Sequence, residues 1–171
     1  MASNTSPSQP TPPTSVSRVL VATDRSATAE RAVGWATEMA DRYGAELWLL
    51  QVLVPEDPMA GAPSTIDRTR LSYAEQELSR EVERLAGERG RARVIVDDDP
   101  AAAIVETAEE ERIDVIVVGN AGMSGRKEFL LGNVPNRVSH NARCTVVIVN
   151  STAAAAEPQP RGLRRLLRRE R

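Results

Sequence analysis

Only one cysteine and one histidine occur among the 171 residues of this sequence. A single cysteine excludes an internal disulfide, and the pair argues against a zinc site, which takes four nitrogen or sulfur ligands. A chain without disulfides suits a reducing compartment. We therefore expect a cytoplasmic protein and no metal centre.

Aromatic residues are also scarce, at 3% of the chain, whereas hydrophobic residues make up 41%. A core built from this composition consists mainly of Ala, Val, Leu and Ile. The net charge of -2 gives no general reason to expect a specific nucleic acid partner. No apolar run reaches membrane-spanning length, and the N-terminus lacks the basic and apolar regions of a secretory signal.

The length fits one domain flanked by tails. Residues Met1–Ser15 are rich in Ser, Thr and Pro and have almost nothing to bury, so we expect a disordered N-terminal tail. Residues 16–150 form the predicted domain. Residues 151–171 are expected to be a linker followed by a basic tail.

The basic tail, Gly162–Arg171, places Leu163, Leu166 and Leu167 on one face if it becomes helical. Such a segment suits an anionic membrane surface, nucleic acid or an acidic partner. It is too short to be a stable helix by itself, and a disordered solubilising tail is the alternative.

Within the domain, short apolar runs alternate with helix-compatible segments. The expected strands are Arg18–Thr23, Glu46–Val54, Arg93–Val96, Val115–Val118 and Val146–Val149, and the expected helices run from Ser26 to Tyr43, Thr65–Arg89, Pro100–Arg112 and Val134–Asn141. This alternation predicts an α/β fold, a single doubly wound parallel sheet of five strands with helices on both faces. The last two runs are continuous in Val and Ile, which is typical of strands buried on both faces.

Several residues mark the ends and faces of these helices. Ser26 is a plausible N-cap of the first helix, and Gly44 stands where a C-terminal stop belongs. Asp99 and Pro100 supply a cap and a first-turn proline to the third helix. Seven positions of the first helix recur at helical spacing and predict one apolar face: Ala29, Ala32, Val33, Ala36, Met39, Ala40 and Tyr43.

The region from Asp114 to Val149 contains the strongest functional signal. Four glycines, Gly119, Gly122, Gly125 and Gly132, follow the fourth strand, and Asn133 is a favoured N-cap for the next helix. A helix N-terminus suits a phosphate, and Arg126 and Lys127 add positive charge. The segment is neither a Walker P-loop nor a dinucleotide fingerprint, and a tight connection is the alternative reading.

Three segments in order resemble the universal stress protein family: Gly119-x2-Gly122-x9-Gly132, VLVATDRSATAERAV near the start, and NVPNRVSHNARCTVVIV near the end. The resemblance covers nearly all of the predicted domain. It implies the strand order 3-2-1-4-5, a stress-related regulatory role and a site for ATP or another adenine nucleotide, such as AMP or cyclic AMP. Magnesium would enter only with the nucleotide.

The resemblance also implies which residues form the site. The nucleoside end would consist of Ala22, Thr23, Asp24 and Val52, and the phosphate end of Gly119, Gly122, Gly132, Asn133 and Val134. The family typically has Ser or Thr where this chain has Asn133, and Pro135 lacks an N–H donor. Both departures weaken the phosphate end more than the nucleoside end.

Two other functions remain open. A nucleotide-independent dimeric interaction protein would explain the departures at Asn133 and Pro135. A slow ATP hydrolase ranks last, because no catalytic base is visible. We interpret His140 as a polar surface residue and Asp97–Asp99 as a cap and solvated turn, so no catalytic residue is predicted.

The final strand, Thr145–Val149, is apolar on both faces and ends the sheet. An uncovered apolar edge favours aggregation unless something pairs with it. Two copies can pair antiparallel about a two-fold axis, and dimerisation of this kind is common in the family that the sequence resembles. We therefore expect a homodimer through this strand.

Overall fold

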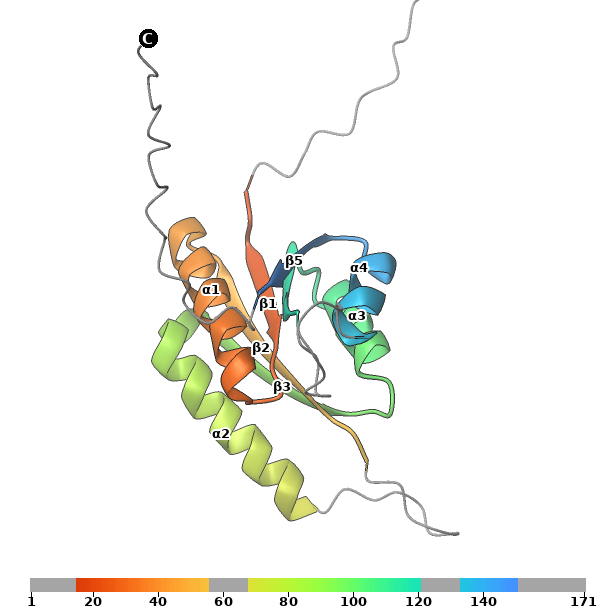
Figure 1. The fold of residues 1–171 in the computed structure, drawn as a ribbon. Coiled ribbons are helices and arrows are strands. Elements are labelled where there is room, and N and C mark those ends of the chain that lie inside the picture. The colour runs from red at the N-terminus through yellow and green to blue at the C-terminus, as the bar shows by residue number, and fades with distance from the viewer. Residues whose placement is uncertain (1–14, 56–67, 121–132, 151–171) are drawn as a thin grey trace, which may run out of the picture.

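The computed structural model describes residues 15–55, 68–120 and 133–150 (Figure 1). The predicted tails, apart from residue 15, and the glycine-rich loop at 121–132 therefore lie outside the described residues. Within the described ranges, no helix combines the length and the apolar content that crossing a bilayer requires.

Strands and helices alternate through the described chain. They are β1 (Arg18–Ala22), α1 (Ala27–Tyr43), β2 (Glu46–Leu53), α2 (Arg68–Ala86), β3 (Gly90–Val96), α3 (Pro100–Glu110), β4 (Val115–Gly119), α4 (Asn133–Asn141) and β5 (Thr145–Val149). The strands form one parallel sheet in the order β3-β2-β1-β4-β5. The predicted fold class and strand order are confirmed.

Helices cover both faces of the sheet, α1 and α2 on one side and α3 and α4 on the other (Figure 1). Because successive strand residues point to opposite faces, each face has its own core. The α1 and α2 side buries Val21, Leu49, Leu78 and Val117, and the α3 and α4 side buries Leu20, Leu50, Ile116 and Val138. The sheet is thus held by aliphatic packing, as the composition predicts.

The predicted helix caps are present. The Oγ of Ser26 accepts a hydrogen bond from the N–H of Ala29 at 3.2 Å. Gly44 ends α1 in the left-handed conformation, with φ of 64°. The Asp99 carboxylate accepts from the N–H of Ala102 at 3.2 Å. These local signals therefore set where α1 and α3 begin and where α1 ends.

Some element boundaries differ from the prediction. β3 begins at Gly90 rather than Arg93. The charged Arg91 fits within the strand because β3 is at the edge of the sheet, where Arg91 pairs with Glu46 and Arg93 with Glu110. α2 ends at Ala86, followed by a 3-10 turn. α4 begins at Asn133 itself, so the predicted N-cap residue forms part of the first turn.

Two burial predictions were wrong. β5 was expected to be buried on both faces, but it is an edge strand whose Ile148 remains 38% exposed. Tyr43 was assigned to the apolar face of α1, and its side chain is 57% exposed. Ala40 in the same turn is only 1% exposed, so the last turn of α1 is covered on its Ala40 side and open at Tyr43.

Gly90 tests the contact between β3 and α2. A Cβ at this position would lie 2.7 Å from the Val82 carbonyl oxygen and 2.9 Å from its Cγ2. Gly90→Ala should therefore lower the free energy of unfolding by about 1–3 kcal/mol, measured by urea denaturation. Gly34→Ala is the matched control, because nothing lies within 4 Å of its added Cβ in α1. The control should raise stability by about 0.5–1 kcal/mol, and equal stability of both variants would contradict the packing.

Candidate functional site

A cavity opens where the carboxyl ends of β1 and β4 meet. The two strands are direct neighbours, with Val21 opposite Val117. The strand order reverses here, because β2 lies on one side of β1 and β4 on the other. Ligands of open parallel sheets bind outside such a reversal. The cavity has a volume of about 70 Å³.

Most of the predicted site residues that the structure describes line this cavity. They are Ala22, Thr23, Asp24, Val52, Gly119 and Val134. Asn133 lies beside them as the exposed first residue of α4, outside the cavity lining. Gly122, Arg126, Lys127 and Gly132 lie outside the described residues. The structure thus brings the predicted nucleoside end together with Gly119 and Val134 from the phosphate end.

Other lining residues were not predicted from the sequence. They are Ala29, Leu50, Pro100, Ile104 and Val118, while Pro135, named above only as a missing donor, lines the cavity as well. Leu50 could have been predicted from the sequence, because it lies two positions before Val52 and strand residues two apart share a face. No sequence pattern identifies Pro100 and Ile104, since α3 reaches the cavity only through the crossover between β3 and β4.

The lining has an apolar floor and a polar rim. Leu50, Ile104 and Val118 are each at most 3% exposed, so the floor is buried aliphatic surface. Thr23 and Asp24 supply the polar side chains of the lining. The volume exceeds the roughly 10–15 Å³ that one water needs, yet it holds only a small part of a nucleotide. A flat ring could enter while the rest of the ligand lies outside.

The turn between β1 and α1 is held by its own side chains. The Ser26 N–H and hydroxyl both donate to Asp24 Oδ1, at 3.0 and 2.6 Å. Thr23 Oγ1 accepts from the N–H of Arg25 at 3.0 Å. These bonds fix the Asp24 carboxylate at the cavity rim before any ligand arrives.

Arg25 joins this turn to α2. It adopts φ of 61°, a left-handed conformation that side chains other than glycine, asparagine and aspartate seldom take. Its guanidinium lies 3.9 Å from a Glu77 carboxylate oxygen and 3.7 Å from one of Glu81. The surrounding contacts therefore maintain a costly backbone conformation directly beside the cavity.

A bidentate ion pair joins the N-cap residue of α3 to the middle of α4, close to the cavity. The two guanidinium nitrogens of Arg137 donate to the two carboxylate oxygens of Asp99, at 2.7 and 2.6 Å. The bonds from Arg137 and then from the Ala102 N–H hold the pKa of Asp99 below its usual 3.8. This pair fixes the spacing of Pro100 and Pro135, which line the cavity from the two helices.

The remaining polar candidates have structural surroundings. Asp97 Oδ1 accepts from the Asp99 N–H at 2.7 Å, in agreement with the predicted capped turn. His140 is exposed in the last turn of α4. Burial raises the pKa of the half-buried Cys144 thiol. Among the described residues, no three His, Cys, Asp or Glu side chains gather closely enough to hold a metal ion.

Asp99 has two roles that substitution separates. Asp99→Asn keeps an N-cap but removes the charge that Arg137 binds, whereas Asp99→Ala removes both. We expect the melting temperature at pH 7 to fall slightly in the Asn variant and by several degrees in the Ala variant.

The contribution of the Asp99 charge to folding stability changes with pH in a defined direction. Because folding lowers the pKa of Asp99, its charge stabilises the protein above the unfolded value of 3.8, and this contribution disappears as pH falls through the folded value. The difference between wild type and Asp99→Asn should therefore vanish in acid. A constant difference from pH 7 to pH 2.5 would contradict the ion pair.

The chain is similar to proteins of one family. Residues 15–150 match the Universal stress protein family. Universal stress protein MJ0531 of Methanocaldococcus jannaschii is 32% identical over 138 residues, which cover 77% of this chain and 81% of that protein.

Solved structures show the same similarity. A universal stress protein in complex with cAMP is 28% identical, with a TM-score of 0.61 over 81% of this chain and 100% of that one. The universal stress protein from Archaeoglobus fulgidus in complex with dAMP is 26% identical, with a TM-score of 0.59 over 78% of this chain and 98% of that one.

Proposed function

Because this chain belongs to the universal stress protein family, we propose that it is an adenine-nucleotide-binding regulatory protein of the cytoplasmic stress response. The observation that supports this function best is the apolar cavity at the carboxyl ends of β1 and β4, with Asp24 at its rim. Relatives of the same fold bind cAMP and dAMP, which share the adenine ring.

The proposed ligand places its adenine on the floor formed by Leu50, Ile104 and Val118. The backbone of Val52 faces the ring edge, and the Asp24 carboxylate accepts from a ribose hydroxyl. Both groups belong to the cavity lining. Buried apolar surface supplies affinity, while a few placed polar groups fix the orientation.

The phosphate group is proposed to lie over Gly119 and the first turn of α4. Unpaired N–H groups and the helix dipole favour an anion there. Pro135 offers no N–H, and Asn133 replaces the usual hydroxyl, so long phosphate chains gain fewer donors. We therefore propose that AMP or cyclic AMP binds at least as tightly as ATP.

Ala29 provides a direct test of the cavity. Its side chain lines the cavity from the first turn of α1. Ala29→Leu should fill the adenine position and weaken binding of AMP, cyclic AMP and ATP by at least about tenfold, or 1.4 kcal/mol. Isothermal titration of the purified protein measures this. Ala27→Leu is the matched control, because Ala27 is exposed in the same turn and does not line the cavity.

The titrations also distinguish the alternatives. No heat with any of these ligands up to millimolar concentration would overturn the nucleotide proposal. Retained dimerisation in that case would favour the nucleotide-independent interaction protein. Phosphate release from ATP that exceeds the rate of the Ala29→Leu variant would support the slow hydrolase instead.

A second copy of the chain is the proposed protein partner, bound at β5. The two sheet edges differ in charge. β3 carries Arg91, paired to Glu46 at 3.0 Å, and Arg93, paired to Glu110 at 2.8 Å, and such charges discourage edge pairing. β5 has no charged residue, and Ile148 is 38% exposed. We propose that two β5 strands pair antiparallel about a two-fold axis.

The backbone hydrogen bonds of β5 support a particular register for the proposed pairing. The N–H of Thr145 donates to the Asp114 carbonyl, and the Val149 carbonyl accepts from Asn120. Because strand hydrogen-bonding groups alternate, residues 145, 147 and 149 face β4. The groups of Val146 and Ile148 therefore point away from the sheet.

Ile148→Pro should break the dimer while sparing the monomer. Proline removes an outward N–H that the β4 pairing does not use, and edge strands tolerate it there. Sedimentation at micromolar concentration should show a dimer for wild type and a monomer for the variant. Val147→Pro is the contrasting control, since it removes an inward donor and should lower the melting temperature. A wild-type monomer would contradict the proposal.

A further inference from the structure

One flank of α1 carries an exposed aromatic stripe. Trp35, Met39 and Tyr43 are spaced by four residues, so they form one ridge along the helix. Trp35 is 39% exposed and Tyr43 57%. Together with Glu38 and Arg42 they line a groove of about 300 Å³, which we call the α1 groove.

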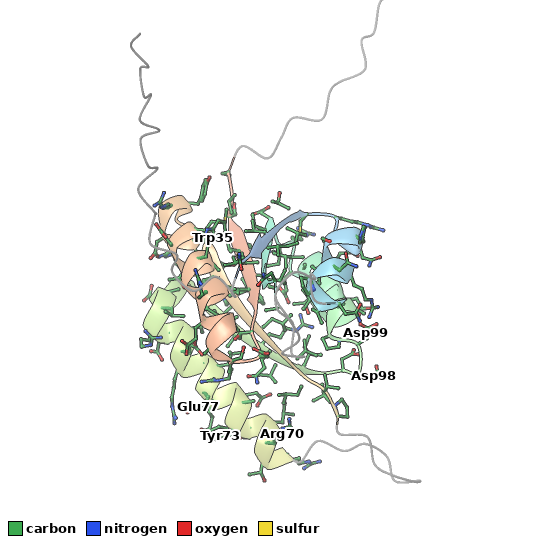
Figure 2. All side chains as sticks on the ribbon, viewed as in Figure 1. Trp35, Arg70, Tyr73, Glu77, Asp98 and Asp99 are labelled. Atoms are coloured by element: carbon green, nitrogen blue, oxygen red, sulfur yellow. The ribbon has the colours of Figure 1, made fainter. Side chains whose placement is uncertain are left out.

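The α1 groove lies on the side of the helix away from α2. Asp41 on the other flank pairs with Arg89, which directly follows α2, at 2.6 Å. Trp35 precedes Asp41 by six residues, which corresponds to about 240° of rotation around a helix. The two side chains therefore lie on different flanks of α1. In Figure 2, Trp35 is labelled on α1, away from the labelled α2 residues Tyr73 and Glu77. α2 packs on β2 and β3, whereas α1 packs on β1 and β4 and also contacts β5, so the flank of α1 away from α2 is the one next to β5.

Such a surface needs an explanation in this chain. Only two tryptophans, two tyrosines and one phenylalanine occur in the whole sequence, and the groove exposes two of these five. Exposed apolar side chains that lie together, here beside Glu38 and Arg42, offer a surface on which a second apolar segment can pack.

We propose that the α1 groove binds the chain's own C-terminal segment, Gly162–Arg171. The sequence of this segment places Leu163, Leu166 and Leu167 at the spacing of one helical face. Three leucines at that spacing form a ridge that fits beside the ridge of Trp35 and Met39. Arginines on the segment can also stack on the exposed aromatic rings.

The opposite net charges of the C-terminal segment and the rest of the chain favour binding of the segment to its own chain. Residues 162–171 contain five arginines and one glutamate. The rest of the chain therefore holds 17 basic and 23 acidic residues, a net charge of -6. A segment of charge +4 is attracted to a body of opposite sign, so complementary charge supplements the apolar contact.

The connection between β5 and the proposed C-terminal segment is long enough to reach the α1 groove. α1 has 17 residues, about 25 Å in length, and runs back alongside the sheet from the edge where β5 ends. The 11 residues 151–161 span at most about 40 Å when extended. A flexible connection of this length gives an effective concentration on the order of 1 mM. A segment whose separate peptide binds with a dissociation constant of about 0.1 mM would then be docked roughly nine-tenths of the time.

The indole N–H signals of the two tryptophans report the docking in the full-length protein. Trp35→Phe assigns the Trp35 signal in a ¹⁵N spectrum. Replacing Leu163, Leu166 and Leu167 together by Ser should shift that signal, leave the Trp48 signal in place and increase acrylamide quenching. The matched control replaces Pro158, Gln159 and Pro160 by Ser and should change neither.

A synthetic peptide of residues 162–171, added to the triple serine variant, should restore the Trp35 signal with a midpoint near 0.1 mM. An unchanged Trp35 signal in the triple variant would overturn the proposal. Sedimentation with vesicles of phosphatidylglycerol and phosphatidylcholine provides a second measurement. Binding of wild type to these vesicles, together with an unchanged Trp35 signal, would assign the segment to an anionic membrane surface instead.

Discussion

The parallel pairing of β1 with β4 is the interaction on which the rest of the structure depends. It places Val21 opposite Val117 in the centre of the sheet, where both residues are fully buried. It also reverses the strand order, so the segments that follow the two strands diverge. The space between them is the cavity. A sheet that placed β4 outside β3 would bury the same apolar residues but separate Asp24 from Gly119.

The two edge strands of the sheet, β3 and β5, differ in how far they are protected against pairing with another strand. Edge strands expose unpaired N–H and C=O groups, and proteins discourage unwanted pairing with charge. Arg91 and Arg93 provide that charge on β3, and each is neutralised by a carboxylate of a neighbouring element. β5 has no such protection. The asymmetry gives the molecule one closed edge and one edge suited to a partner.

The family resemblance implied the part of the candidate site that directly follows strands. Ala22, Thr23 and Asp24 come at the end of β1, and Gly119 at the end of β4, and all four line the cavity. The contribution of α3 could not be predicted in this way. Ile104 reaches the cavity because the crossover between β3 and β4 packs α3 against the sheet, and no local pattern specifies which helix residues then face a ligand.

The sequence by itself determined the order of elements, their apolar faces and their caps. Ser26 and Gly44 act on backbone groups within a few residues, so their capping roles can be predicted from the local sequence. Only the tertiary structure decided the contacts between distant segments. Arg137 lies 38 positions after Asp99, and Tyr43 remains 57% exposed although Ala40 in the same turn is buried. Such contacts arise from the packing of whole helices on the sheet, which depends on the geometry of the fold and not on local spacing.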